Sequence, residues 1–184
     1  MKKKLYLLFV TATVLSSLAI SKPISLSAIK GESFLNYLLI HPFHEVEAVC
    51  KELTCTVQYD DATHTIIGTS FNADVMSFDS GNSNRDSHAM EVLDALSFPT
   101  VSFQSKNITN SGDQLQVTGD LTFHGVTKTI SFPATATSAN SKLTVQGKAN
   151  VSLTAFQIER PSLLMIPVQD TLRISFTMVF PISK

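Results

Sequence analysis

The sequence predicts an all-β fold, an antiparallel barrel of about eight strands crossed by one short helix. Apolar and polar residues alternate through five consecutive segments that follow residue 100, as they do in strands with one buried face. Turn-forming residues separate these segments, for example at residues 110–113 and 138–141. An antiparallel sheet of this length can close into a barrel, which leaves no strand with an unpaired edge. A barrel of about eight strands encloses either packed side chains or one small ligand.

Residues 77–103 interrupt the strand pattern and indicate a loop, a helix and a stop. Ser83 and Asn84 are residue types that cap helices, so a helix is expected to begin near Arg85. Pro99 ends it, because proline disfavours the α conformation of the residue before it. The apolar positions at helical spacing are Met90, Leu93 and Leu96.

The first 21 residues have the pattern of a secretory signal peptide. Lys2, Lys3 and Lys4 precede an apolar run, and Ala19-Ile20-Ser21 ends in small residues, so cleavage is expected after Ser21. The alternative is an uncleaved anchor, but the run over residues 5–14 is shorter than the roughly 20 residues that a spanning helix needs. Residues 22–32 then form a linker, and residues 33–184 form a single domain that is exported.

Charge and composition argue against two classes of partner. Loss of the three leader lysines lowers the net charge from −1 to −4, with eleven basic side chains against fifteen acidic ones. The chain has no tryptophan and no basic run, so it is not expected to bind nucleic acid or anionic membrane surfaces. The sequence contains no glycine-rich phosphate loop and no GxSxG motif, and we expect no enzyme and no cofactor.

The two cysteines are expected to lie on adjacent strands of a hairpin. If residues 51–54 form the loop, Cys50 and Cys55 face each other on the apolar side. Export would allow a disulfide between them, and two buried thiols are an equal alternative. A redox site of the CxxC type is not predicted, because the spacing differs.

Two separated motifs carry a family resemblance. The segment GNSNRDSH over residues 81–88 leads into a Phe-Pro-x-x-x-Phe strand, and GDLTFHGVTK follows at residues 119–128. In this order they resemble the YceI-like family, over the chain from about residue 33 onward. The resemblance implies a lipocalin-like, eight-stranded barrel with the helix at its mouth, a periplasmic location, and binding of polyisoprenoid or other long-chain lipids. Residues 158–165 replace the Asn-Arg-x-Asp-Phe-Gly-type stretch that is usual in the family.

The predicted function is therefore an exported carrier that holds a long-chain apolar ligand, such as a polyisoprenoid or a quinone. Its cavity is expected to be lined by the inward-facing residues Leu38, Val117, Leu121, Phe132, Val145, Leu164, Met165, Phe176 and Met178. Arg85 is the candidate for an anionic or carbonyl head group, although a cluster such as Arg85, Asp86 and His88 more often forms a network that fixes the start of the helix.

Alternatives remain for the interior and for the partners. The small inward residues Gly119, Gly147 and Ala149 leave a channel or merely let the barrel taper. A solidly packed barrel would instead act as a structural or interaction module for envelope or respiratory proteins. The sequence leaves a homodimer open. The histidines are not spaced as a compact metal site, and no metal is predicted.

Overall fold

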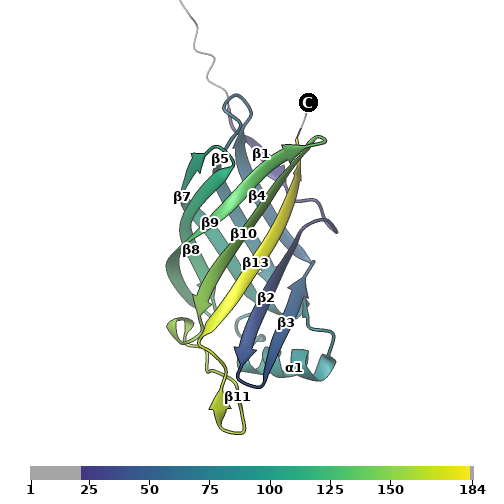
Figure 1. Ribbon diagram of the computed structural model, residues 1–184, viewed down its shortest axis with the longest axis vertical. Coiled ribbons are helices and arrows are strands. Elements are labelled where there is room, and N and C mark those ends of the chain that lie inside the picture. The colour runs from purple at the N-terminus through teal and green to yellow at the C-terminus, as the bar shows by residue number, and fades with distance from the viewer. Residues whose placement is uncertain (1–21, 183–184) are drawn as a thin grey trace, which may run out of the picture.

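One strongly curled antiparallel sheet forms the body of the protein (Figure 1). The structure is a computed structural model that describes residues 22–182. The sheet strands are β1 (Ile24–Ser27), β2 (Phe34–His41), β3 (His44–Cys50), β4 (Leu53–Asp60), β5 (Thr65–Asp74), β6 (Phe78–Asp79), β7 (Thr100–Ser111), β8 (Gln114–Phe123), β9 (Val126–Ala139), β10 (Lys142–Ser152) and β13 (Thr171–Pro181). The all-β prediction with one short helix is therefore confirmed.

The predicted eight-stranded, closed barrel is only partly correct. The sheet contains eleven strands in the order β1-β4-β5-β7-β8-β9-β10-β13-β2-β3-β6. Within residues 22–182 no strand pairing joins the β6 edge to the β1 edge, so the sheet is curled but not closed by a continuous ladder. The two short edge strands are β1, which pairs with β4, and β6, which pairs with β3. They are too short to show the apolar–polar alternation from which the longer strands were predicted.

The expected hairpin of the two cysteine-bearing strands is wrong. Cys50 pairs with Leu35 on β2 and with Phe78 on β6, whereas Cys55 pairs with Phe71 on β5. The chain turns a corner between β3 and β4 over only two residues, and the strands then diverge to different partners.

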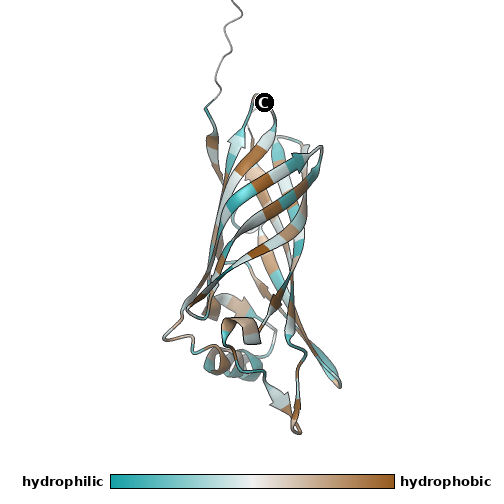
Figure 2. Ribbon diagram, turned by 90° about the vertical axis from the view of Figure 1, so that its left-hand side faces the viewer, coloured by the Kyte–Doolittle hydropathy of each residue, from teal (hydrophilic) through white to brown (hydrophobic). Residues whose placement is uncertain are grey.

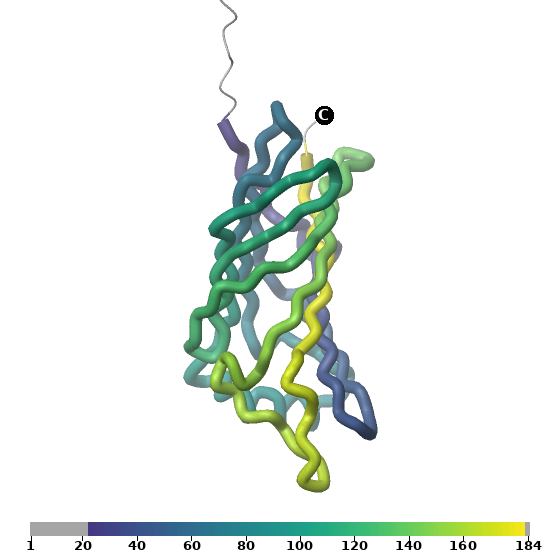
Figure 3. The backbone as a smooth tube through the Cα atoms, turned by 60° about the vertical axis from the view of Figure 1, so that its left-hand side comes forward, coloured from purple at the N-terminus to yellow at the C-terminus, as the bar shows by residue number. Residues whose placement is uncertain are grey.

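The segment predicted as a linker is partly structured. Residues 24–27 form β1 against β4, and the chain then crosses from β4 to β13. The amide of Ala28 donates to the carbonyl of Cys55 at 2.8 Å, and the amide of Ile29 donates to that of Val179 at 2.7 Å. This crossing closes the end of the sheet at which both described termini lie (Figure 3). The predicted signal peptide lies outside the described residues.

The opposite end is covered by the helix α1 (Ser83–Val92), which lies across the strand ends (Figure 1). It begins two residues earlier than expected, because the cap is Asn82, whose side chain accepts from the amides of Asn84 and Arg85. Irregular turns follow up to Pro99. Two short 3-10 segments complete the path, η1 (Val75–Ser77) and η2 (Thr154–Phe156).

A separate two-stranded hairpin projects from the α1 end. It consists of β11 (Ser162–Leu163) and β12 (Ile166–Pro167), and its tip is among the apolar parts of this end in Figure 2. The described residues include no helix that is long and apolar enough to cross a membrane.

Candidate functional site

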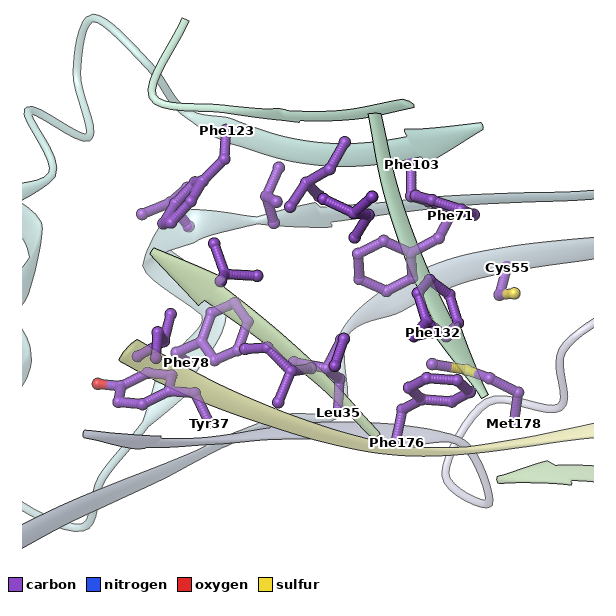
Figure 4. Close-up of a pocket in the computed structure, with 18 of the residues that line it drawn as sticks. Leu35, Tyr37, Cys55, Phe71, Phe78, Phe103, Phe123, Phe132, Phe176 and Met178 are labelled. Atoms are coloured by element: carbon purple, nitrogen blue, oxygen red, sulfur yellow. The ribbon is translucent and has the colours of Figure 1, made fainter. Parts of the chain in front are cut away.

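An apolar cavity of about 240 Å³ lies inside the curled sheet (Figure 4). Its wall is built by the inward-facing residues of most long strands, as the alternation predicted. Six of the predicted lining residues are on this wall: Val117, Leu121, Phe132, Val145, Phe176 and Met178. Their identification as ligand contacts remains a prediction.

Four predicted residues are not on the cavity wall. Leu38 is on the other face of β2, because Leu35, Tyr37 and Leu39 have the inward parity. Residues 33–40 are apolar at both parities, so the sequence contained no signal to choose between them. Leu164 and Met165 lie at the tip of the β11–β12 hairpin and are 75% and 95% exposed.

Arg85, the fourth of these residues, binds the loop before the helix. Its Nε donates to the hydroxyl of Ser80 and its Nη2 donates to the carbonyl of Ser80, both at 2.9 Å. The carboxylate of Asp86 accepts from the amide and hydroxyl of the same serine. The two side chains thus form the helix-start network that was the alternative to a head-group site.

Aromatic rings fill the space beside the small inward residues. Phe132 packs between Phe103 and Phe176, with ring centroids 5.4 and 5.8 Å away. A Cβ placed on Gly147 would lie 2.4 Å from Cζ of Phe176, and one on Gly119 would lie 2.5 Å from Cζ of Phe103. The two glycines therefore admit rings instead of leaving a channel. We call Phe103, Phe132 and Phe176 the aromatic cluster.

The helix end of the cavity is formed by α1 and the segments beside it. Ala89, Met90 and Leu93 contribute apolar side chains from the helix and the residue after it, and Met76 and Pro161 lie on the wall as well. α1 contains no buried residue, and the turns after it are held by hydrogen bonds such as that from the Ala95 amide to the Met90 carbonyl, at 3.0 Å. This end is thus covered by a short element with limited packing.

Few polar groups reach the cavity. The Tyr37 hydroxyl points to the α1 end, opposite the aromatic cluster (Figure 4), and its ring lies 5.6 Å from that of Phe78. Burial raises the pKa of Tyr37, and the nearby Asp86 carboxylate raises it further, so the group is a neutral phenol at physiological pH. Sequence reasoning missed Tyr37, although its place between Leu35 and Leu39 was a usable signal once the parity of β2 is known.

The cysteines are free and buried, on different parts of the sheet. Cys55 lies on the cavity wall, and burial raises the pKa of its thiol to about 11. The Cys50 sulfur lies 3.1 Å from the hydroxyl of Ser77, and burial raises its pKa as well. Both groups are therefore protonated and unreactive thiols at neutral pH. Within residues 22–182, no three histidine, cysteine or acidic side chains gather as a metal site.

These features define a class of protein, an all-β fold whose curled sheet encloses an apolar cavity and carries a short helix over one end. The model of the YceI-like domain matches residues 30–180, and the chain belongs to this family. Among curated proteins, Protein YceI of Salmonella newport is 28% identical over 105 residues, which are 55% of either chain. The match thus spans about half the length of that relative.

Two solved structures have the same fold. BcnA of Burkholderia cenocepacia superposes with a TM-score of 0.75 at 23% identity, over 83% of this chain and 98% of that one. A domain from Saccharophagus degradans, described as polyisoprenoid binding, superposes with a TM-score of 0.68 at 12% identity, over 86% and 98% of the two chains.

Proposed function

We propose that this protein carries one long-chain apolar ligand, of the isoprenoid, quinone or lipid type, inside the curled sheet. The observation that carries the proposal is the cavity, whose wall consists almost entirely of aliphatic and aromatic side chains. The description of the Saccharophagus relative as polyisoprenoid binding supports the ligand class. The leader-like first 21 residues support an exported, periplasmic carrier.

Energetics favour a long chain over a small apolar molecule. Each buried methylene contributes about 0.8 kcal/mol, so ten of them contribute roughly 8 kcal/mol. Association costs about 4–15 kcal/mol in lost translation, rotation and ordering. Short hydrocarbons would therefore exchange freely, whereas a chain that fills the cavity and extends past α1 would be retained.

The polar end of the ligand is proposed to lie near Tyr37. Asp86 is the only charged residue on the cavity wall within residues 22–182, and it already accepts two hydrogen bonds from Ser80. An uncharged head group, such as a hydroxyl or a carbonyl, can pair with the neutral Tyr37 hydroxyl without burying a charge. A strongly anionic head would have to stay outside the cavity.

The cavity also argues against the alternative function, in which a solidly packed barrel acts as a structural or interaction module. Leu35, Tyr37 and Phe71 remain partly exposed although they point inward, which a fully packed core would not leave. A carrier needs this incomplete filling, whereas a structural module gains nothing from it.

Native mass spectrometry of the protein purified from its own cell tests the proposal. The wild type is expected to retain one apolar molecule, which denaturation releases for identification. Ala149→Phe places a ring in the cavity and should give a folded, ligand-free protein. Ala139→Phe adds the same ring at an exposed position and should retain the ligand. Equal ligand occupancy in both variants, or a wild type that binds no added lipid, would contradict the carrier function.

A further inference from the structure

Large apolar side chains are exposed at the α1 end, on three separate protrusions. Met165 is 95% exposed and Leu164 75% exposed at the tip of the β11–β12 hairpin. Phe43, in the turn between β2 and β3, is 63% exposed, and Leu96, after α1, is 90% exposed. Figure 1 shows that these elements lie at the same end of the sheet. We call residues 163–166 the hairpin tip.

The backbone of the hairpin tip is unfavourable for its own residues. Leu163 pairs with Ile166, so Leu164 and Met165 form a two-residue loop, with φ of 52° and 64°. Positive φ at both positions is the type I′ turn, which favours Asn-Gly and disfavours large side chains. Neither local conformation nor packing explains why leucine and methionine occupy these positions, and strain of this kind marks functional segments.

Hydrogen bonds fix the position of the hairpin relative to the end of β2. The Arg160 guanidinium donates to the carbonyl of Val168, whose own amide donates to the carbonyl of Pro161 at 2.9 Å. The buried ring of His41 accepts from the amide of Phe43 at Nδ1, so its Nε2 donates to the carbonyl of Ile166, at 2.9 Å. The hairpin is therefore tied to β2 at Ile166, next to its two-residue loop.

The arrangement suits a fluid apolar phase better than a protein surface. A stable protein interface needs a continuous, complementary area of more than about 1,000 Å². Here the apolar groups occupy the tips of separate protrusions, which can each enter the acyl region of a bilayer independently. Residues 161–168 carry no ionisable side chain, so insertion would bury no charge.

The segment that leads into the hairpin reaches the cavity. Ile158 and Pro161, just before β11, are on the cavity wall, as are Met90 and Leu93 of the helix end. A bilayer that receives the hairpin tip would thus contact the segment that covers the cavity. A long-chain lipid could then pass between the two apolar phases without crossing water.

We propose that the α1 end docks on a lipid bilayer by inserting the hairpin tip, with Phe43 and Leu96 at the same surface. This inference rests on the proposed carrier function for its purpose, but the docking itself can be measured without any cargo. Because apolar burial and not charge drives it, the docking should occur on zwitterionic phosphatidylcholine vesicles and should be insensitive to salt.

Fluorescence provides the test, because the chain has no tryptophan. Met165→Trp places a single indole at the hairpin tip, and Ile67→Trp places one at a half-exposed position on β5 as a control. With phosphatidylcholine vesicles, the indole at position 165 should shift to the blue and be quenched by brominated acyl chains, whereas the indole at position 67 should do neither. Absence of both signals at position 165 would overturn the inference.

A matched pair of variants separates docking from folding. Leu164→Asn with Met165→Gly supplies the preferred turn residues, so it should raise the melting temperature while lowering vesicle partition about a hundredfold. Ile67→Asn removes a comparable side chain elsewhere and should leave vesicle partition unchanged. Undiminished partition of the double variant would contradict the inference.

Three outcomes distinguish the docking inference from the carrier function and from dimer formation. If the wild type retains an apolar ligand but never binds vesicles, docking fails while the carrier function stands. If vesicles bind but no ligand is ever retained, the carrier function fails while docking stands. Concentration-dependent dimers that the double variant abolishes, without vesicle binding, would assign the hairpin tip to a second copy of the chain and overturn the inference.

Discussion

The two ends of the curled sheet are built from the same alternating strands, yet they differ in how completely they bury their apolar side chains. At the end near the termini, Tyr59, Leu143 and Phe180 are 2%, 3% and 0% exposed, and hydrogen bonds of Ala28 and Ile29 connect β4 to β13. At the α1 end, a helix without buried residues covers the cavity, and large apolar tips face solvent. One end is thus more completely buried than the other, and under the proposed carrier function the less buried α1 end is where the ligand enters.

The largest expected difference between the ends is in stability. Leu143→Ala removes a fully buried side chain from the closed end and should cost about 2–5 kcal/mol in the free energy of unfolding. Leu39→Ala makes the same change on the cavity wall close to the α1 end of β2, next to space that is already empty, and should cost about half as much. Urea denaturation measures both, and equal costs would remove the distinction between the ends.

The second prediction concerns pH and Cys55. Because burial raises the pKa of this thiol from 9.0 to about 11, the folded protein keeps its proton over a range in which the unfolded chain loses it. The contribution of the protonated Cys55 thiol to the free energy of unfolding is therefore fully present below pH 9.0. It is lost as the pH rises toward 11, which lowers the free energy of unfolding by about 2 kcal/mol.

Cys55→Val should abolish this part of the alkaline loss, as measured by urea denaturation at stepped pH. Alkylation before unfolding should leave both thiols unmodified. Rapid alkylation of the folded protein, or a disulfide between Cys50 and Cys55 in the purified protein, would contradict the placement of both cysteines as buried, free thiols.

The third prediction sharpens the role of the aromatic cluster. Phe176→Ala enlarges the cavity next to Gly147 and should shift the preference for ligand chain length by about tenfold toward longer or bulkier chains. Arg85→Ala loosens the loop before α1 and should leave that preference unchanged. Competition between lipids of graded chain length measures the shift, and identical preferences in both variants would exclude the aromatic cluster from the binding site.

The smallest expected effect is at Tyr37. Tyr37→Phe removes only a hydroxyl and should weaken ligands with a hydroxyl or carbonyl head about three- to tenfold, as expected for one neutral hydrogen bond. Pure hydrocarbon chains of the same length should bind the variant as they bind the wild type. A loss that is equal for both ligand types would indicate altered packing and not a lost hydrogen bond.

Strand alternation was sufficient to predict the fold class and six lining residues, because inward and outward positions differ in polarity from β7 onward. It failed where that contrast is absent. β2 is apolar at both parities, so Leu38 was predicted to face inward in place of Leu35, Tyr37 and Leu39. β1 and β6 are too short to show a period, and their pairing replaced the expected hairpin between the cysteines.

The hairpin tip shows a different limit. Leu164 and Met165 were predicted to line the cavity as members of the inward-facing set, and they carry none of the turn signals that mark a type I′ loop. The folded structure shows that both residues occupy a two-residue loop with positive φ and are exposed. Leucine and methionine violate the residue preference of this turn and gain no packing in return. Such a violation suggests that the two side chains serve an interaction with another molecule, which the proposed docking on a bilayer would supply.

The most direct test of the difference between the two ends is a crystal structure of the lipid-loaded protein. We expect one lipid chain in the cavity, with its polar head near the Tyr37 hydroxyl and α1 and its tail against Phe132 and Phe176. A head group at the end near Tyr59 and Leu143, or side chains that refill the cavity while the lipid binds elsewhere, would contradict this expectation.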